Sequence, residues 1–177
     1  LHARTGDLRL DDGTAIDTSA VPKAIFDQTV YSPGGRIELQ ADHGAIHLAS
    51  NAGLDVSADA GGGDAGELRI VAPERQAELL GALKGSAPKG RGGRIDIDVG
   101  AALDLDGLSQ RLNDGGINQR VAVRTRRGDL ALSVGHTLKA REISLTADGG
   151  ADATTRDADN GHVRIAGTLD ASGTSGG

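Results

Sequence analysis

Residues 35–41 read Gly35-Arg-Ile-Glu-Leu-Gln-Ala41, in which aliphatic and polar side chains alternate after a corner glycine. Strict alternation of this kind predicts a strand with one buried face. The same template, Gly-x-h-x-h-x-Ala with h aliphatic and small variations, returns at residues 66–72, 93–99, 141–147 and 161–166. If residues 121–123 are an unmarked copy, successive copies start roughly 20 to 31 residues apart, the range of solenoid repeats. We therefore expect a parallel β-helix.

A second template carries Leu-Asp, at residues 53–58, 102–107 and 168–173. Aliphatic residues two positions apart are predicted to point inward as pairs. These pairs are Leu8/Leu10, Ile37/Leu39, Ile46/Leu48, Leu54/Val56, Leu68/Ile70, Ile95/Ile97, Leu103/Leu105, Val121/Val123, Leu130/Leu132, Ile143/Leu145 and Val163/Ile165. An antiparallel sandwich would share the alternation, but most links here are Ala-, Ser- or Gly-rich corners rather than Asn-Gly or Asp-Gly turns.

Outward-facing charges predict how the copies stack. Successive copies carry Arg36, Glu67 and Arg94 at one outward position and Glu38, Arg69 and Asp96 at the next. Stacking about 4.8 Å apart in register places opposite charges side by side in both columns, and each pair contributes a fraction of a kcal/mol. The columns are expected to continue as Arg120, Glu142, His162 and as Ala122, Ser144, Arg164, so that Arg94 faces Arg120.

One short inserted helix is predicted near residues 73–84. This segment starts with Pro73 and an acidic turn, ends in Lys84 before a glycine, and places Ala77, Leu80 and Leu83 on one face. We expect a single all-β domain, a right-handed parallel β-helix, that is part of a longer protein. Its expected parts are an irregular lead-in or partial coil over 1–34 and coils over 35–177, with insertions at 73–92, 106–119 and 147–161.

The composition restricts the possible functions. The chain of 177 residues contains 28 Gly, one Phe, one Tyr and no Cys, Met or Trp, and its formal net charge is −6. A core of this chain must therefore be aliphatic, since aromatic side chains are nearly absent. The acidic balance makes nucleic acid a poor partner, and no apolar run reaches the roughly 18 residues that span a bilayer. Without Cys there are no disulfides or thiolate metal sites.

The order of several motifs resembles that of filamentous-haemagglutinin-like proteins, which are large exported adhesins of Gram-negative bacteria. The motifs are Ser32-Pro33-Gly34-Gly35-Arg-Ile-Glu-Leu, Gly53-Leu-Asp-Val-Ser-Ala58, Leu68-Arg-Ile-Val-Ala-Pro73, Leu83-Lys-Gly-Ser86, Gly92-Gly-Arg-Ile-Asp-Ile-Asp-Val99 and Gly167-Thr-Leu-Asp-Ala-Ser-Gly173. The resemblance implies a right-handed parallel β-helix shaft, export by two-partner secretion through an outer-membrane transporter, and a secreted or cell-surface location. Right-handedness is also the physical rule for parallel crossovers.

Arg127-Gly128-Asp129 spells the tripeptide that integrin-type receptors read. A random arrangement of this composition would contain about 0.27 copies, so the match by itself means little. Gly128 also fits a simple corner that leads into the strand of Leu130. The tripeptide is therefore a candidate receptor-binding site in competition with a structural corner.

Asp96, Asp98, Asp104 and Asp106 are predicted to point outward from neighbouring strands of one coil. Such a carboxylate cluster could hold calcium or act on a glycan as an acid and base pair. No aromatic platform for a sugar lies in this region, so a solvated face partnered by Arg69 and Arg94 is the competing interpretation. No nucleophile elbow, Walker or dinucleotide motif is present, and we expect no catalytic residues, metal or cofactor.

The sequence thus predicts a structural shaft segment that spaces or presents a distal binding region, and not an enzyme. The alternatives are a glycan-binding or glycan-cleaving β-helix and a receptor-binding module that uses the tripeptide at 127–129. The expected partners are a host-cell or surface receptor, bound through the parent protein, and the transporter during export, with no membrane insertion. Open ends of the stack are expected either to carry irregular caps or to associate end to end.

Overall fold

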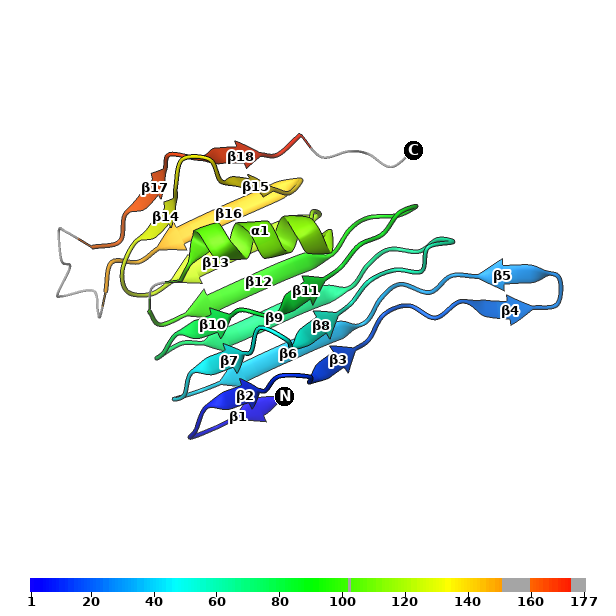
Figure 1. Cartoon of the computed structure of the whole chain (residues 1–177), viewed down its shortest axis with the longest axis horizontal. Coiled ribbons are helices and arrows are strands. Elements are labelled where there is room, and N and C mark those ends of the chain that lie inside the picture. Colours follow the sequence, from blue (N-terminus) through cyan, green and yellow to red (C-terminus); the bar gives the residue numbers. More distant parts are fainter. Residues whose placement is uncertain (102, 151–159, 173–177) are drawn as a thin grey trace.

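The computed structural model describes residues 1–101, 103–150 and 160–172, which form mainly parallel β-strands with one short helix (Figure 1). The largest sheet has six strands, and every neighbouring pair in it is parallel. In spatial order these strands are β1 (His2–Ala3), β6 (Arg36–Ala41), β9 (Glu67–Ala72), β12 (Arg94–Val99), β13 (Arg120–Thr125) and β16 (Glu142–Ala147). This is also their order along the chain, so each strand pairs with its equivalent in the next repeat.

Shorter strands form two further sets of parallel pairs. One set contains β2 (Leu8–Leu10), β7 (Ile46–Leu48) and β10 (Ala77–Leu79), and later β14 (Leu130–Leu132) with β17 (Val163–Ile165). The other contains β3 (Ala15–Asp17), β8 (Gly53–Asp55) and β11 (Ala82–Lys84), and later β15 (Thr137–Lys139) with β18 (Thr168–Asp170). Most repeats therefore hold one strand of the large sheet followed by one strand of each shorter set.

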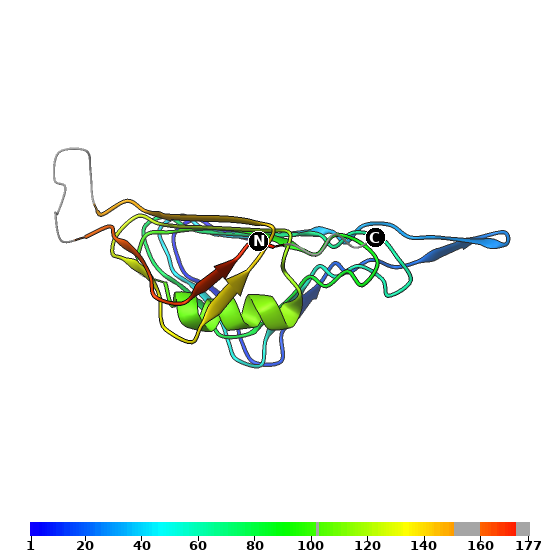
Figure 2. The same ribbon diagram turned by 90° about the horizontal axis from the view of Figure 1, so that it is seen from above.

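The aliphatic core lies between the large sheet and the shorter strands, which Figure 2 shows on opposite sides of the molecule. The predicted inward pairs from Leu8/Leu10 through Leu130/Leu132 are buried. Ile143 and Leu145 on β16 are only partly buried, and Val163 and Ile165 on β17 are exposed. The last pairs differ because no further strand among the described residues covers β16 and β17.

The predicted register of the charged columns is confirmed. Glu67 stands opposite both Arg36 and Arg94, and Arg69 stands opposite both Glu38 and Asp96. The Arg69 Nε atom lies 3.4 Å from a carboxylate oxygen of Glu38. As expected, Arg94 faces Arg120 on the next strand.

Arg120 resolves this like-charge contact by pairing with carboxylates on both neighbouring strands. Its guanidinium group lies 3.7 Å from Asp96 and 3.3 Å from Glu142. The expected continuation of the columns to His162 and Arg164 is wrong, because β17 pairs with β14 and not with β16. Alternation alone could not distinguish these two locations, since a buried aliphatic pair fits either set of strands.

The predicted helix at residues 73–84 is also wrong, because this segment forms β10 and β11. Ala77 and Leu79 are buried as an alternating pair, and Leu80 is exposed. Gly81 lies in the corner between the two strands, where a side chain would overlap the carbonyl oxygens of Ala49 and Ala52. The segment therefore continues both shorter sets of strands rather than interrupting them.

The helix of the structure is α1 (Leu105–Gly115), within the stretch that was expected to be an insertion at 106–119. Asp104 caps its start by accepting a hydrogen bond from the Gly107 amide at 3.0 Å, and Gly116 ends it with a φ of 73°. Leu105, Leu108 and Leu112 form its buried face. The expected strand position of Leu105 is therefore wrong, although its burial is not. The helix packs against β11, β14 and β15.

Residues 1–34 contain β1, β2 and β3, which pair in register with β6, β7 and β8. They also contain β4 (Lys23–Ile25) and β5 (Gln28–Val30), an antiparallel hairpin that projects away from the stacked strands (Figures 1 and 2). We call residues 20–31 the arm and the remaining described residues the body. The expected insertion at 147–161 lies largely outside the described residues, which omit 151–159.

Candidate functional site

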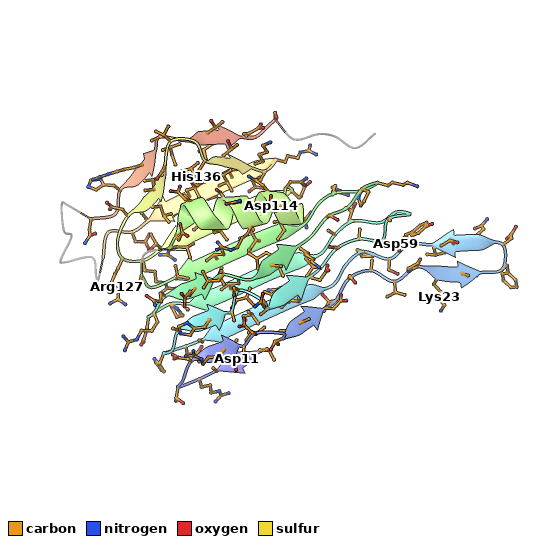
Figure 3. All side chains as sticks on the ribbon, viewed as in Figure 1. Asp11, Lys23, Asp59, Asp114, Arg127 and His136 are labelled. Atoms are coloured by element: carbon orange, nitrogen blue, oxygen red, sulfur yellow. The ribbon has the colours of Figure 1, made fainter. Side chains whose placement is uncertain are left out.

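Arg127, Gly128 and Asp129 form the corner between β13 and β14, at the end of the body away from the arm (Figure 3). Gly128 has a φ of 86°, which favours glycine at this corner. The Arg127 Nε atom donates a hydrogen bond to the Gly100 carbonyl oxygen at 2.8 Å, and a terminal guanidinium nitrogen donates to the Glu74 carbonyl at 2.5 Å. Arg127 thus links its own corner to corners of two earlier repeats.

Asp129 is bonded in the opposite direction, to the following repeat. Its carboxylate accepts a hydrogen bond from the His162 backbone amide at 2.9 Å and lies 3.9 Å from the Arg164 guanidinium. The hydrogen bond from His162 is the main cause that lowers the pKa of Asp129. Both charged side chains of the tripeptide therefore hold neighbouring corners together, which is the role expected of a structural corner.

Asp96 and Asp98 lie on the outer face of the large sheet, which we define as the face that bears Glu38 and Arg69 and points away from the core. Asp98 accepts two hydrogen bonds from the Arg126 guanidinium, at 2.8 and 2.9 Å. These hydrogen bonds are the main cause that lowers the pKa of Asp98, and they raise the pKa of Arg126. Asp96 pairs with Arg120 at 3.7 Å, so both carboxylates have cationic partners, as expected for a solvated face. The partners differ from those expected, because Arg69 pairs with Glu38 and Arg94 faces Glu67 and Arg120.

Asp104 and Asp106 lie instead at the start of α1. Asp104 is the helix cap, and Asp106 accepts a hydrogen bond from the Ser133 backbone amide at 2.8 Å. Hydrogen bonding to Ser133 is the main cause that lowers the pKa of Asp106. Because α1 lies on the opposite side of the large sheet from Asp96 and Asp98, the four predicted carboxylates do not share one site (Figure 2). No group of three or more His, Asp or Glu side chains in the described ranges could hold a metal ion.

A polar groove is a feature that the sequence did not predict. It brings together side chains from corners of several repeats. Its polar lining residues are Asp64, Arg91, Asn118, Gln119, Lys139, Arg141, Asp170 and Ser172. Arg91 pairs with Asp64 at 3.2 Å within the groove. The amide, cationic and anionic groups of this surface could form hydrogen bonds with a polyhydroxylated ligand. No local motif indicates the groove, because its residues become neighbours only when the repeats stack.

The arm holds both aromatic residues of the chain, Phe26 and Tyr31. The Phe26 side chain is fully exposed at the tip, with a relative accessibility of 103%, and its φ of 54° is the one positive value of a non-glycine residue among the described positions. The Tyr31 ring packs at the base of the arm against Gly61 and Gly62, where a side chain on either glycine would crowd it. The glycine run thus anchors the arm.

No family model, no curated protein and no solved structure matches this chain. In the described part of the chain, no helix is both long enough and apolar enough to cross a membrane.

Proposed function

We propose that this chain is a right-handed parallel β-helix that serves as a rigid shaft segment of a secreted or surface-exposed bacterial protein of the adhesin type. In this role it spaces or presents a distal binding region of the parent protein. The observation that carries the proposal is the unbroken parallel pairing from β1 to β16, in which sequence order and spatial order coincide. In such a stack, each repeat adds to the length of the molecule.

Repeats stacked at the ordinary strand spacing add about 4.8 Å each, so the five steps between β1 and β16 amount to roughly 24 Å. The Arg120 pairs with Asp96 and Glu142, together with the Arg69 pair with Glu38, oppose slippage of one repeat against the next. Right-handed winding is proposed because parallel crossovers are almost always right-handed.

The use of charged corner residues also supports a structural role. Arg127 spans three corners, Asp129 holds the next one, and Asp98 is engaged by Arg126. These side chains form their hydrogen bonds with neighbouring repeats, as a stiff rod requires. We further propose that the parent protein leaves the cell through an outer-membrane transporter and binds its host-cell receptor through another region.

A replacement experiment tests the spacing role in the parent protein. Deletion of the segment should reduce adhesion, and an unrelated β-helix with the same number of repeats should restore it. Restoration would show that the length of the segment matters rather than its surface chemistry. Adhesion that survives deletion, or that only the original sequence restores, would contradict the proposal.

The polar groove favours glycan binding as a second candidate function. Asn118 and Gln119 offer donors and acceptors there, next to Arg91 and Lys139. A glycan array probed with the isolated chain at high concentration tests this candidate. Binding that Asn118→Ala removes, while Asn51→Ala at an exposed corner does not, would support it, and an array without signal would refute it.

A further inference from the structure

The arm is an exposed apolar surface that the shaft role does not use. Residues 21–31 are all exposed, and they include Val21, Ile25, Phe26 and Val30. In the hairpin register, Lys23 pairs with Val30 and Ile25 with Gln28. Because cross-strand partners project from the same face, Ile25 and Val30 share one side of the arm.

The backbone conformation at the tip of the arm is unfavourable for the residue found there, Phe26. The two-residue turn between β4 and β5 gives Phe26 a φ of 54°, a region that favours Gly, Asn or Asp. Strained residues of this kind concentrate at functional sites. An exposed phenyl ring on a strained turn, with its base anchored by Tyr31, is therefore presented to solvent for contact with a partner.

A groove between β10 and α1 combines apolar and charged residues that match those of the arm. Its apolar lining consists of Ala77, Leu79, Leu80, Leu103 and Leu108, and its polar rim consists of Gln76, Glu78, Asp104 and Arg111. Leu80 is 45% exposed, although it lies beside the buried Leu79. The groove thus combines an apolar floor with one cation and two carboxylates at its edge.

The charges of the arm complement those of the rim. Asp27 follows Phe26 at the tip of the arm. Lys23 is the first residue of β4 and lies nearer the base of the arm. With the phenyl ring on Leu80, Asp27 can meet Arg111 while Lys23 meets one of the two carboxylates. Glu78 also pairs with His47 at 3.2 Å, and Asp104 caps α1 through one of its two oxygens. The Arg111 Nε atom donates to the Leu80 carbonyl oxygen at 3.1 Å, which holds the guanidinium group at the edge of the groove.

We propose that the arm of one copy of this chain docks in the groove between β10 and α1 of a second copy, with Phe26 against Leu80 and Asp27 beside Arg111. The arm projects beyond the body, so this contact forms between copies (Figures 1 and 3). End-to-end stacking is the less favourable route to association. In the register of the existing strands it would bring Arg9 against Arg164 and Asp17 against Asp170.

Docking of an arm in a groove joins two different surfaces, so a dimer keeps one free groove on the first copy and one free arm on the second. The contact is small, and we expect a dissociation constant on the order of 0.1 mM. Sedimentation velocity from roughly 10 µM to 1 mM should show concentration-dependent association of the chain. Phe26→Ser and Leu80→Ser should each weaken it by at least about tenfold. Val134→Ser, at another exposed apolar position, should not.

Mixing is the decisive step. A Phe26→Ser copy retains its groove and a Leu80→Ser copy retains its arm. At the same total concentration an equimolar mixture should therefore form more dimer than either variant alone. Likewise, Asp27→Arg should associate with Arg111→Asp but not with itself. Circular dichroism spectra that match the unsubstituted chain ensure that each variant is folded.

Three outcomes would overturn the proposal. The chain could stay monomeric over the whole range. Association could be lost in Phe26→Ser but unaffected by Leu80→Ser, which would indicate pairing between two arms. The unsubstituted chain could instead remain monomeric and sediment with phosphatidylcholine vesicles, with Phe26→Ser remaining in solution, which would assign the arm to a lipid surface.

Discussion

Leu39 and Ile70 are fully buried in the body, whereas Phe26, one of only two aromatic residues, is fully exposed on the arm. The two regions also differ in strand direction, since the body stacks parallel strands and the arm is an antiparallel hairpin. In the interior of the body, aliphatic pairs such as Leu39 and Ile70 are covered by the repeats on both sides. In the arm Val21, Ile25, Phe26 and Val30 all remain exposed, and Phe26 is fully so.

This difference explains the composition of the chain. Stacked repeats leave little space between the large sheet and the shorter strands, and aliphatic pairs fill it. Aromatic side chains are therefore unnecessary inside, and the two that occur serve the arm, one at its anchor and one at its tip. Aromatic side chains, which dominate most protein cores, lie instead on the candidate contact surface of this chain.

Substitutions in the body should lower the free energy of unfolding far more than substitutions in the arm. Leu39→Ala removes a fully buried side chain from the core and should lower the free energy of unfolding by about 2–5 kcal/mol. Phe26→Ala removes a larger side chain that contacts little and should change it by less than about 0.5 kcal/mol. Urea denaturation of both variants measures the difference, and equal losses would refute the proposed division between body and arm.

The next expected effect concerns Asp98 in the body. Its pKa is lowered mainly by hydrogen bonds from Arg126, so its contribution to stability is present above the unfolded-state pKa of about 3.9 and is lost as the pH falls through the lower folded-state value. Asp98→Asn should therefore lower the free energy of unfolding by about 1 kcal/mol or less near neutral pH.

This prediction is tested by the pH dependence of the difference in unfolding free energy between Asp98→Asn and the unsubstituted chain. The gap between Asp98→Asn and the unsubstituted chain should stay constant down to about pH 5 and shrink below pH 4. Urea titrations at a series of pH values measure it, with Asp11→Asn at an exposed corner as the control. A gap that widens in acid would show that the Arg126 contact does not stabilise the ionised carboxylate.

A smaller effect is expected from the charged columns. Glu67→Arg places a third Arg between Arg36 and Arg94 and should lower the free energy of unfolding by about 0.2–1 kcal/mol. Glu74→Arg makes the same charge change outside the strands, where it removes an exposed contact with His43, and should cost less. If the two variants have the same midpoint of thermal unfolding, the columns do not contribute to register.

The smallest effect on global stability is expected at the base of the arm. Tyr31→Ala removes the ring that packs on Gly61 and Gly62, so the arm should open locally while the body stays folded. Hydrogen exchange should become about tenfold faster at residues 23–30 and remain unchanged in β9 and β12. Phe26→Ala, which leaves the anchor intact, should not change the exchange rates. Faster exchange throughout the body would mean that the arm is part of the folded core.

Alternation and charge did not predict β1 and wrongly added residues 161–166, but they predicted the other five strands of the large sheet. The templates at 35–41, 66–72 and 93–99 all lie in it, and the outward charges face one another as expected. The helix was misplaced because Ala77, Leu80 and Leu83 fit a helical period while Ala77 and Leu79 fit a strand. The spacing of Leu105, Leu108 and Leu112 between Asp104 and Gly116 was the stronger helical signal.

The candidate contact surfaces were less predictable. A positive φ at Phe26 could not be expected, because the segment lacks the Asn-Gly or Asp-Gly pair that normally forms a two-residue turn. The contacts of Arg127 with the Gly100 and Glu74 carbonyls cross two repeats and leave no local pattern. The polar groove likewise joins residues as distant as Asp64 and Asp170, whose proximity depends on the number of repeats between them.

Paired spin labels measure whether the strands of the large sheet stack in parallel and in register. Arg36 and Glu142 begin the first and last of five consecutive strands of the large sheet, and Gln40 and Thr146 occupy equivalent later positions on the same two strands. Parallel stacking predicts the same separation for both pairs, about 19 Å between backbone positions. Two narrow and matching distance distributions from pulsed electron spin resonance are the expected result. Clearly unequal distances, or broad distributions for both pairs, would contradict parallel stacking and with it the shaft.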